Sequence, residues 1–135
     1  MPISTEGPSA DRDREIALHQ AAWAERAIDS YTVSITRACF CPPGAIGPYV
    51  ITVVDGSATE VLFEGAPADP SLVGTAFPLT IDAVFERLRN LEPRATMTAT
   101  WDPDWGFPTS VSVDPIPNAI DDEYSISIAA FAPAD

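Results

Sequence analysis

Apolar and polar residues follow one another along this chain in two helical stretches and in several shorter runs with the period of β-strands. The clearest helix begins after Thr80, a favourable N-cap residue, and its apolar residues recur at i, i+3, i+4, i+7 and i+10. The residues of this apolar stripe are Ile81, Val84, Phe85, Leu88 and Leu91. A first helix is predicted from Asp11 to about Asp29, with acidic residues in its first turn and Trp23 on its apolar side.

Six shorter segments are predicted to be strands, because they alternate apolar and hydroxyl residues or are rich in β-branched residues between turn signals. They are 31–37, 49–54, 58–64, 95–101, 109–114 and 124–131. Asp55-Gly56 is typical of a type I′ hairpin turn, and a second hairpin is predicted around the turn at 102–106. The segment 65–78 holds three prolines and two glycines, which predicts a crossover loop.

These elements predict an α+β domain with the order αβββαβββ. The strands have one hydroxyl-rich side and follow one another through hairpins, which favours an antiparallel sheet with both helices packed on one face. The residues expected to pack between helices and sheet are Trp23, Phe85 and Leu88. Residues 1–10 are predicted to be a flexible leader, and 11–135 to be a single domain of ordinary size.

The charge balance excludes several classes of function. Twenty acidic residues against seven arginines give a net charge of −13, which would repel nucleic acid and anionic lipid. The chain has no lysine, so a Schiff-base nucleophile, a P-loop lysine and a Ser-Lys catalytic pair are excluded. No apolar run approaches the roughly 20 residues of a transmembrane helix, so no membrane span is expected.

An ordered set of segments resembles an uncharacterised bacterial family, domain of unknown function family 6174. The segments are Trp23, Tyr31, Cys39–Pro42, Val53–Gly56, Ile81–Phe85, Trp101–Pro108 and Asp121–Glu123. The family's members are often predicted envelope lipoproteins or secreted proteins, with no assigned reaction, cofactor or catalytic residue. The resemblance therefore implies an extracytoplasmic location, in the periplasm, envelope or medium, with a cytoplasmic one left open. It assigns no catalytic residue.

The two cysteines, Cys39 and Cys41, are the most chemically reactive feature of the sequence. Side chains at i and i+2 of an extended segment share a face and can bond only if the chain kinks. The pair is interpreted as a loop disulfide in an exported protein, two free thiols in a cytosolic one, or a redox pair. The implied extracytoplasmic location favours a disulfide between the two, with the first strand ending by Ala38. With His19 distant, zinc is not expected.

Acidic residues gather near the predicted strand ends. They are Asp102, Asp104, Asp114, Asp121, Asp122 and Glu123. Calcium chooses clustered oxygen ligands of this kind, but the spacing matches no EF-hand, and aspartates beside proline and glycine usually make Asx-turns. The turn interpretation is favoured, and no metal or other cofactor is predicted.

Three aromatic residues crowd the second hairpin turn, namely Trp101, Trp105 and Phe107. Aromatics at a turn can form an exposed patch that binds a peptide, a sugar or another protein. The alternative is structural: Trp101 ends a core-facing strand, and Trp105 folds over the edge of the sheet.

No catalytic constellation emerges from these patterns, so the leading hypothesis is a non-enzymatic, extracytoplasmic binding or structural module. The alternative is a small hydrolase or redox enzyme that uses the acidic residues or the Cys39/Cys41 pair. A cleft lined by three or more of the six acids would favour the enzyme, because catalysis needs convergent polar groups in a concave site.

Overall fold

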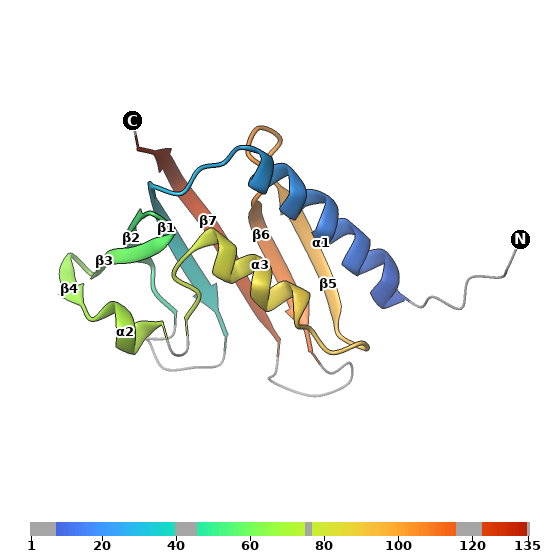
Figure 1. Ribbon diagram of the computed structural model, residues 1–135. Helices are drawn as coiled ribbons and strands as arrows, with labels where there is room; N and C mark the ends of the chain where they lie inside the picture. Colours follow the sequence, from blue (N-terminus) through green and yellow to red (C-terminus); the bar gives the residue numbers. More distant parts are fainter. Residues whose placement is uncertain (1–7, 40–45, 75–76, 116–122, 135) are drawn as a thin grey trace, which may run out of the picture.

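A computed structural model describes residues 8–39, 46–74, 77–115 and 123–134. Figure 1 shows a single sheet with the two longer helices lying across one face. The helices are α1 (Pro8–Glu25), α2 (Pro70–Val73) and α3 (Ile81–Arg89). The strands are β1 (Tyr31–Ala38), β2 (Tyr49–Val54), β3 (Ser57–Phe63), β4 (Ala66–Ala68), β5 (Thr96–Trp101), β6 (Pro108–Asp114) and β7 (Tyr124–Pro133). The predicted α+β class, with an antiparallel sheet and both helices on one face, is confirmed.

The described strands form a seven-stranded antiparallel sheet in the order β4-β3-β2-β1-β7-β6-β5. The hairpin between β2 and β3 turns at Asp55 and Gly56, both with positive φ (51° and 82°), as the type I′ prediction requires. The last strand lies between β1 and β6, pairing Ile128 with Ile35 and Ile126 with Val111. β7 therefore joins the four strands β1–β4 to the hairpin of β5 and β6 in one sheet.

Two short elements correct the predicted order. The segment predicted as a loop contains β4, which pairs with β3, and α2, which begins after Asp69. The Asp69 carboxylate caps α2 by accepting a hydrogen bond from Ser71 N–H (2.9 Å). β4 has three residues and α2 has four, so neither is long enough for its hydrophobic period to repeat and mark it in the sequence.

The first helix begins earlier than predicted. Its first residue is Pro8 rather than Asp11, so the last residues of the predicted leader belong to α1. Proline fits the first turn of a helix, where no backbone N–H is needed. Residues 1–7 lie outside the described part of the chain.

The core lies between α1, α3 and the sheet. The stripe residues Ile81, Val84, Phe85 and Leu88 of α3 are all 0% exposed. Trp23 of α1 is also buried, and its indole N–H donates a hydrogen bond to Asp82 of α3 (2.9 Å). The predicted packing of Trp23, Phe85 and Leu88 is confirmed.

Tyr31, at the start of β1, carries an alkaline pH dependence of stability. Its buried hydroxyl accepts a hydrogen bond from Ile81 N–H (2.9 Å). Burial raises the pKa of Tyr31 to about 12, helped by the charge of Asp82 and opposed by the Ile81 hydrogen bond. Because the folded pKa exceeds the unfolded value, this contribution is complete below about pH 10 and is lost toward about pH 12.

Between about pH 10 and pH 12, we expect the titration of Tyr31 to lower the free energy of unfolding by roughly 2–3 kcal/mol. Urea unfolding of wild type and Tyr31→Phe at a series of alkaline pH values measures it. The variant lacks the ionisable hydroxyl, so its stability should fall less steeply. Parallel curves for the two proteins would show that Tyr31 is not the titrating group.

Candidate functional site

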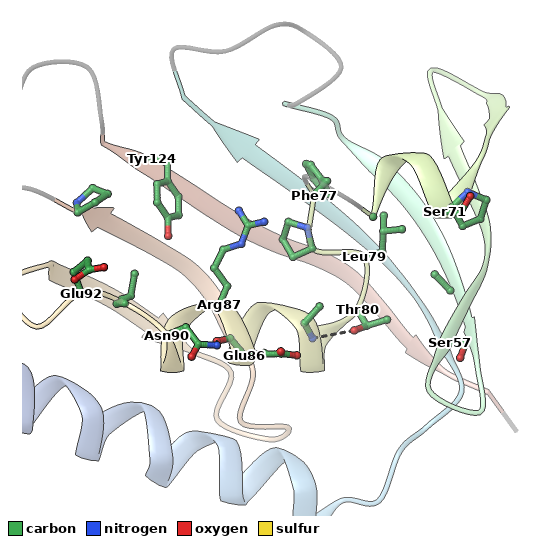
Figure 2. A pocket seen from close by; sticks show the side chains of 17 residues that line it. Ser57, Ser71, Phe77, Leu79, Thr80, Glu86, Arg87, Asn90, Glu92 and Tyr124 are labelled. Carbon is green, nitrogen blue, oxygen red and sulfur yellow. Dashed lines mark hydrogen bonds between the residues drawn. The ribbon is translucent and has the colours of Figure 1, made fainter.

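A groove of about 1000 Å³ runs beside α3, with α2 and the start of β3 across from it. Figure 2 shows the side chains that line it, from Ser57 and Ser71 at one end to Glu92 and Tyr124 at the other. This volume lies at the upper end of the roughly 300–1,000 Å³ range of small-molecule sites. The groove is therefore large enough for an organic ligand.

One wall of the groove is apolar and held by the core. Phe77, Pro78 and Leu79 lead into α3, and all three are buried by their packing while they line the groove. The Phe77 ring also packs edge-on against Tyr49 of β2, with centroids 4.7 Å apart. Because these residues are fixed by the fold, the wall needs no rearrangement to accept an apolar group.

The Tyr124 end of the groove is polar and is lined by one basic residue, Arg87, while Arg37 lies behind the Tyr124 ring and is not a lining residue. Arg87 projects from α3 toward the side on which Tyr124 lies, as Figure 2 shows. The guanidinium carbon of Arg37, near the end of β1, lies 5.2 Å from the centroid of the Tyr124 ring. Arg37, Arg87 and Tyr124 are called the Arg–Tyr cluster below.

The two arginines of the cluster repel each other. Burial lowers the pKa of Arg87, and the positive charge of Arg37 lowers it further, while Tyr124 acts in the opposite direction. Burial raises the pKa of Tyr124, and both arginines oppose that rise. Tyr124 is thus a neutral hydroxyl at physiological pH.

The hydroxyl groups that line the groove are not arranged as nucleophiles. Thr80 Oγ1 accepts a hydrogen bond from Ala83 N–H (2.9 Å) as the N-cap of α3, as predicted. Ser71 Oγ donates to the carboxylate of Asp69 (2.8 Å). The only histidine of the chain, His19, lies on α1 and does not line this groove. The groove therefore lacks a Ser-His pair.

The model of a family of unknown function, DUF6174, matches residues 15–133. The chain belongs to the DUF6174 family. The resemblance inferred from the sequence is confirmed, and the matched range contains the whole Arg–Tyr cluster. No curated protein and no solved structure matches this DUF6174 chain. Within its described residues, no helix combines the length and apolar character needed to cross a membrane.

The acidic residues predicted from the sequence are spread over different places in the DUF6174 domain. Asp102 makes an Asx-turn, its Oδ1 accepting hydrogen bonds from the N–H groups of Asp104 (2.8 Å) and Trp105 (2.9 Å). Asp102 and Asp104 line a cavity of about 850 Å³ beside α1. Asp114 and Glu123 line another, of about 460 Å³.

None of the three cavities brings together three of the six predicted acids in the described part of the chain. The described residues also contain no group of three or more histidine, cysteine or acidic side chains placed to hold a metal ion. Asp121 and Asp122 lie outside the described residues, so their part of that prediction stays a prediction.

The predicted aromatic patch is largely turned inward. Phe107 is only 3% exposed and belongs to the core. Trp101 stacks on His19 of α1 (4.1 Å between centroids), and its indole N–H donates to Glu15 (2.8 Å). His19 is therefore part of a contact between α1 and the β5–β6 hairpin. Only Trp101 and Trp105 keep partly exposed surface that an external partner could reach.

The hairpin turn that carries these aromatics presses against α1. Gly106 has φ +91°, and a Cβ there would lie 2.9 Å from the backbone nitrogen of Trp23. Trp105 packs on Phe131 (5.1 Å) and lies under the guanidinium of Arg26 (5.6 Å). Because Gly106 has no Cβ, the turn can pack closely against α1, and it covers one end of the core.

Cys39 directly follows β1, which ends at Ala38 as expected. It lines the same cavity as Asp114 and Glu123. Cys41 lies outside the described residues, so the pairing of Cys39 with Cys41 stays a prediction.

The Arg–Tyr cluster was not found from the sequence, although one signal pointed to it. Along β1 the residues at 31, 33 and 35 are buried, and Arg37 continues the same face. A charge at an inward position of an alternating strand is unusual and marks a polar site at the end of the core. Arg87 and Tyr124 give no comparable signal, because each stands at the border of an otherwise ordinary element.

Proposed function

We propose that this DUF6174 domain is a non-enzymatic binding module that holds an anionic ligand in the groove, at the Arg–Tyr cluster. The observation that carries the proposal is that a groove of about 1000 Å³ joins a buried apolar wall to Arg87 and Tyr124 at its polar end. The chain has only seven arginines against twenty acidic residues. Arg87 lines the groove, where its positive charge would attract a bound anion.

Other arginines of the chain serve the fold rather than a ligand. Arg12 is buried and binds backbone carbonyl groups, Arg14 pairs with Asp11, and Arg89 donates to Gln20 (3.0 Å). The alternative of a hydrolase gains no support from Ser71 and Thr80 of the groove, because their hydroxyls are used in capping and turn contacts. Binding is the function that the groove's donors and apolar wall favour.

The variant Arg87→Gln tests this proposal with benzoate as the probe. We expect benzoate to shift amide NMR signals of residues that line the groove, and the variant to weaken binding about 10- to 100-fold. That range corresponds to losing a hydrogen bond to a charged group, roughly 1.5–3 kcal/mol. Arg89→Gln is the matched control, since it removes the same charge from the same helix but does not line the groove.

An equal effect of both variants would reduce the interaction to non-specific charge attraction and would reject the site. The absence of benzoate-induced shifts at groove residues in the wild-type protein would reject it as well.

We place the module outside the cytoplasm as part of the same proposal. The support is the close-set pair Cys39 and Cys41, the only cysteines of the chain, together with the resemblance to a family of often secreted proteins. Free-thiol titration of protein purified without reductant and then unfolded should find no reactive sulfhydryl. Because the ring is small, reduction should lower the melting temperature by only a few degrees, from about 1–2 kcal/mol. Two reactive sulfhydryls would remove the chemical support for export.

A further inference from the structure

The sheet ends on two very different edge strands. At one end, β4 is only three residues long and has Pro67 in its middle, which limits pairing with another strand. At the other end, β5 pairs with β6 on one side and with no described strand on the other, as Figure 1 shows. Its residues, Thr96–Trp101, include no charge and no proline, and its register shift falls at its last residue. β5 therefore lacks the features that protect most edge strands from pairing.

The two ends of β5 carry opposite charges. Arg94, in the turn just before the strand, is exposed. Asp102 and Asp104 follow the strand, and together with Glu25 of α1 they line the cavity of about 850 Å³ beside that helix. These three carboxylates outnumber the one arginine in the lining, Arg26. The end of the strand is therefore acidic, whereas its beginning presents a cation.

A two-fold arrangement of two copies would join these complementary ends. When two β5 strands pair antiparallel, the beginning of each lies beside the end of the other. With Thr98 on the two-fold axis, the turn that carries Arg94 lies beside Asp102 and Asp104 of the second copy, within reach of a long side chain. The contact occurs twice, because a two-fold interface repeats each of its contacts. A parallel, in-register pair would instead bring like charges together.

The side chains of β5 suit the same register. Thr96, Thr98 and Thr100 are exposed on the open face of the sheet, where Thr98 would meet Thr98 and Thr96 would meet Thr100. Met97 and Ala99 pack against the core on the helix side, and each would meet the other. Cross-strand threonine pairs stabilise a sheet, and a large side chain facing a small one fits without crowding.

We propose that β5 is a docking edge for a second copy of this chain, which continues the sheet as an antiparallel, two-fold pair of β5 strands. Arg94 of each copy then lies at the acidic cavity of the other. Leu18 of α1, which is 68% exposed, lines that cavity and would also lose contact with water. No residue of β5 lines the groove beside α3, so the inference is independent of the proposed binding function.

A concentration series with the full-length protein tests the docking edge. One six-residue strand is a small seam beside stable interfaces of about 1,200–2,000 Å², so we expect a weak dimer, with a Kd of about 10–500 µM. Sedimentation velocity should show dimer formation over this range, and the amide NMR signals of residues 96–100 should shift with it. A protein that stays monomeric to about 1 mM would overturn the proposal and leave the edge to a strand of another protein.

A lysine on the two-fold axis tests where the copies meet. Thr98→Lys places two positive charges directly opposite each other, so we expect the Kd to rise at least about fivefold. Ser112→Lys is the matched control, because Ser112 is exposed on the same face and pairs with Thr98 inside the sheet. It adds the same charge away from the axis and should change the Kd by no more than about twofold. Equal effects of the two variants would show that the copies do not meet at β5.

Two charge reversals test the antiparallel arrangement. Arg94→Glu brings acid to acid, and Asp104→Arg brings arginine to arginine, so each variant alone should dimerise at least about threefold more weakly. Mixed in equal amounts, the two variants carry opposite charges at positions 94 and 104 at both ends of the seam. We therefore expect the mixture to recover dimerisation as a heterodimer. A mixture no more dimeric than either variant alone would overturn the two-fold, antiparallel pairing.

Discussion

Replacing Phe85 by alanine is expected to lower the free energy of unfolding by about 3–5 kcal/mol. The Phe85 side chain is 0% exposed, and its ring stacks on Trp101 with centroids 6.1 Å apart. It sits where α3 presses on the sheet, so its removal leaves a cavity that neighbours in regular elements cannot close. A loss of this size is a large part of the roughly 5–15 kcal/mol that stabilises a domain.

Urea unfolding of the wild type and Phe85→Ala measures this loss. Glu86→Ala is the matched control, because it truncates the adjacent, exposed residue of the same helix and should change stability by at most about 0.5 kcal/mol. A loss below about 1 kcal/mol for Phe85→Ala would mean that the apolar stripe of α3 does not face the core.

Replacing Arg12 by methionine is expected to cost about 2–4 kcal/mol, although arginine is rarely a core residue. Its guanidinium is buried and donates to the backbone carbonyl oxygens of Glu92 (2.9 Å) and Ala95 (2.6 Å). These contacts tie α1 to the segment that joins α3 to β5. Methionine preserves the length and apolar stem of the side chain, so the loss reports the two unsatisfied carbonyl groups together with the lost ion pair between Arg12 and Asp13 (3.0 Å).

The control for this prediction is Arg14→Met, two residues further along α1. Arg14 is exposed and pairs with Asp11 on the same helix, and such surface pairs contribute about 0–1 kcal/mol. Both variants remove one positive charge, so their difference in denaturant midpoint reports the buried hydrogen bonds. Equal midpoints would show that the Arg12 contacts do not stabilise the fold.

The elements that depend on neighbouring residues were predictable. Four features follow from residues close together in the sequence. They are the apolar stripe of α3, its Thr80 cap, the alternation along β1 and the Asp55-Gly56 turn. Side-chain period and backbone preference act over that distance, so the pattern identifies the element and its buried face. The α+β class followed from the order of these elements.

Contacts between distant segments could not be predicted in this way. No local pattern states that β7 inserts between β1 and β6, because any exposed strand edge offers the same backbone donors and acceptors. Likewise, nothing near Arg12 in the sequence indicates that it binds the carbonyl groups of Glu92 and Ala95. Such contacts depend on how whole elements pack.

The candidate site belongs to this second kind. Arg37 comes from β1, Arg87 from α3 and Tyr124 from the start of β7, and of the three only Arg37, on the buried face of its strand, stands out in the sequence. They become a site because the central place of β7 brings Tyr124 beside β1 and beneath α3. The composition of the chain decided that basic groups are scarce, and the packing of the sheet decided where two of them meet.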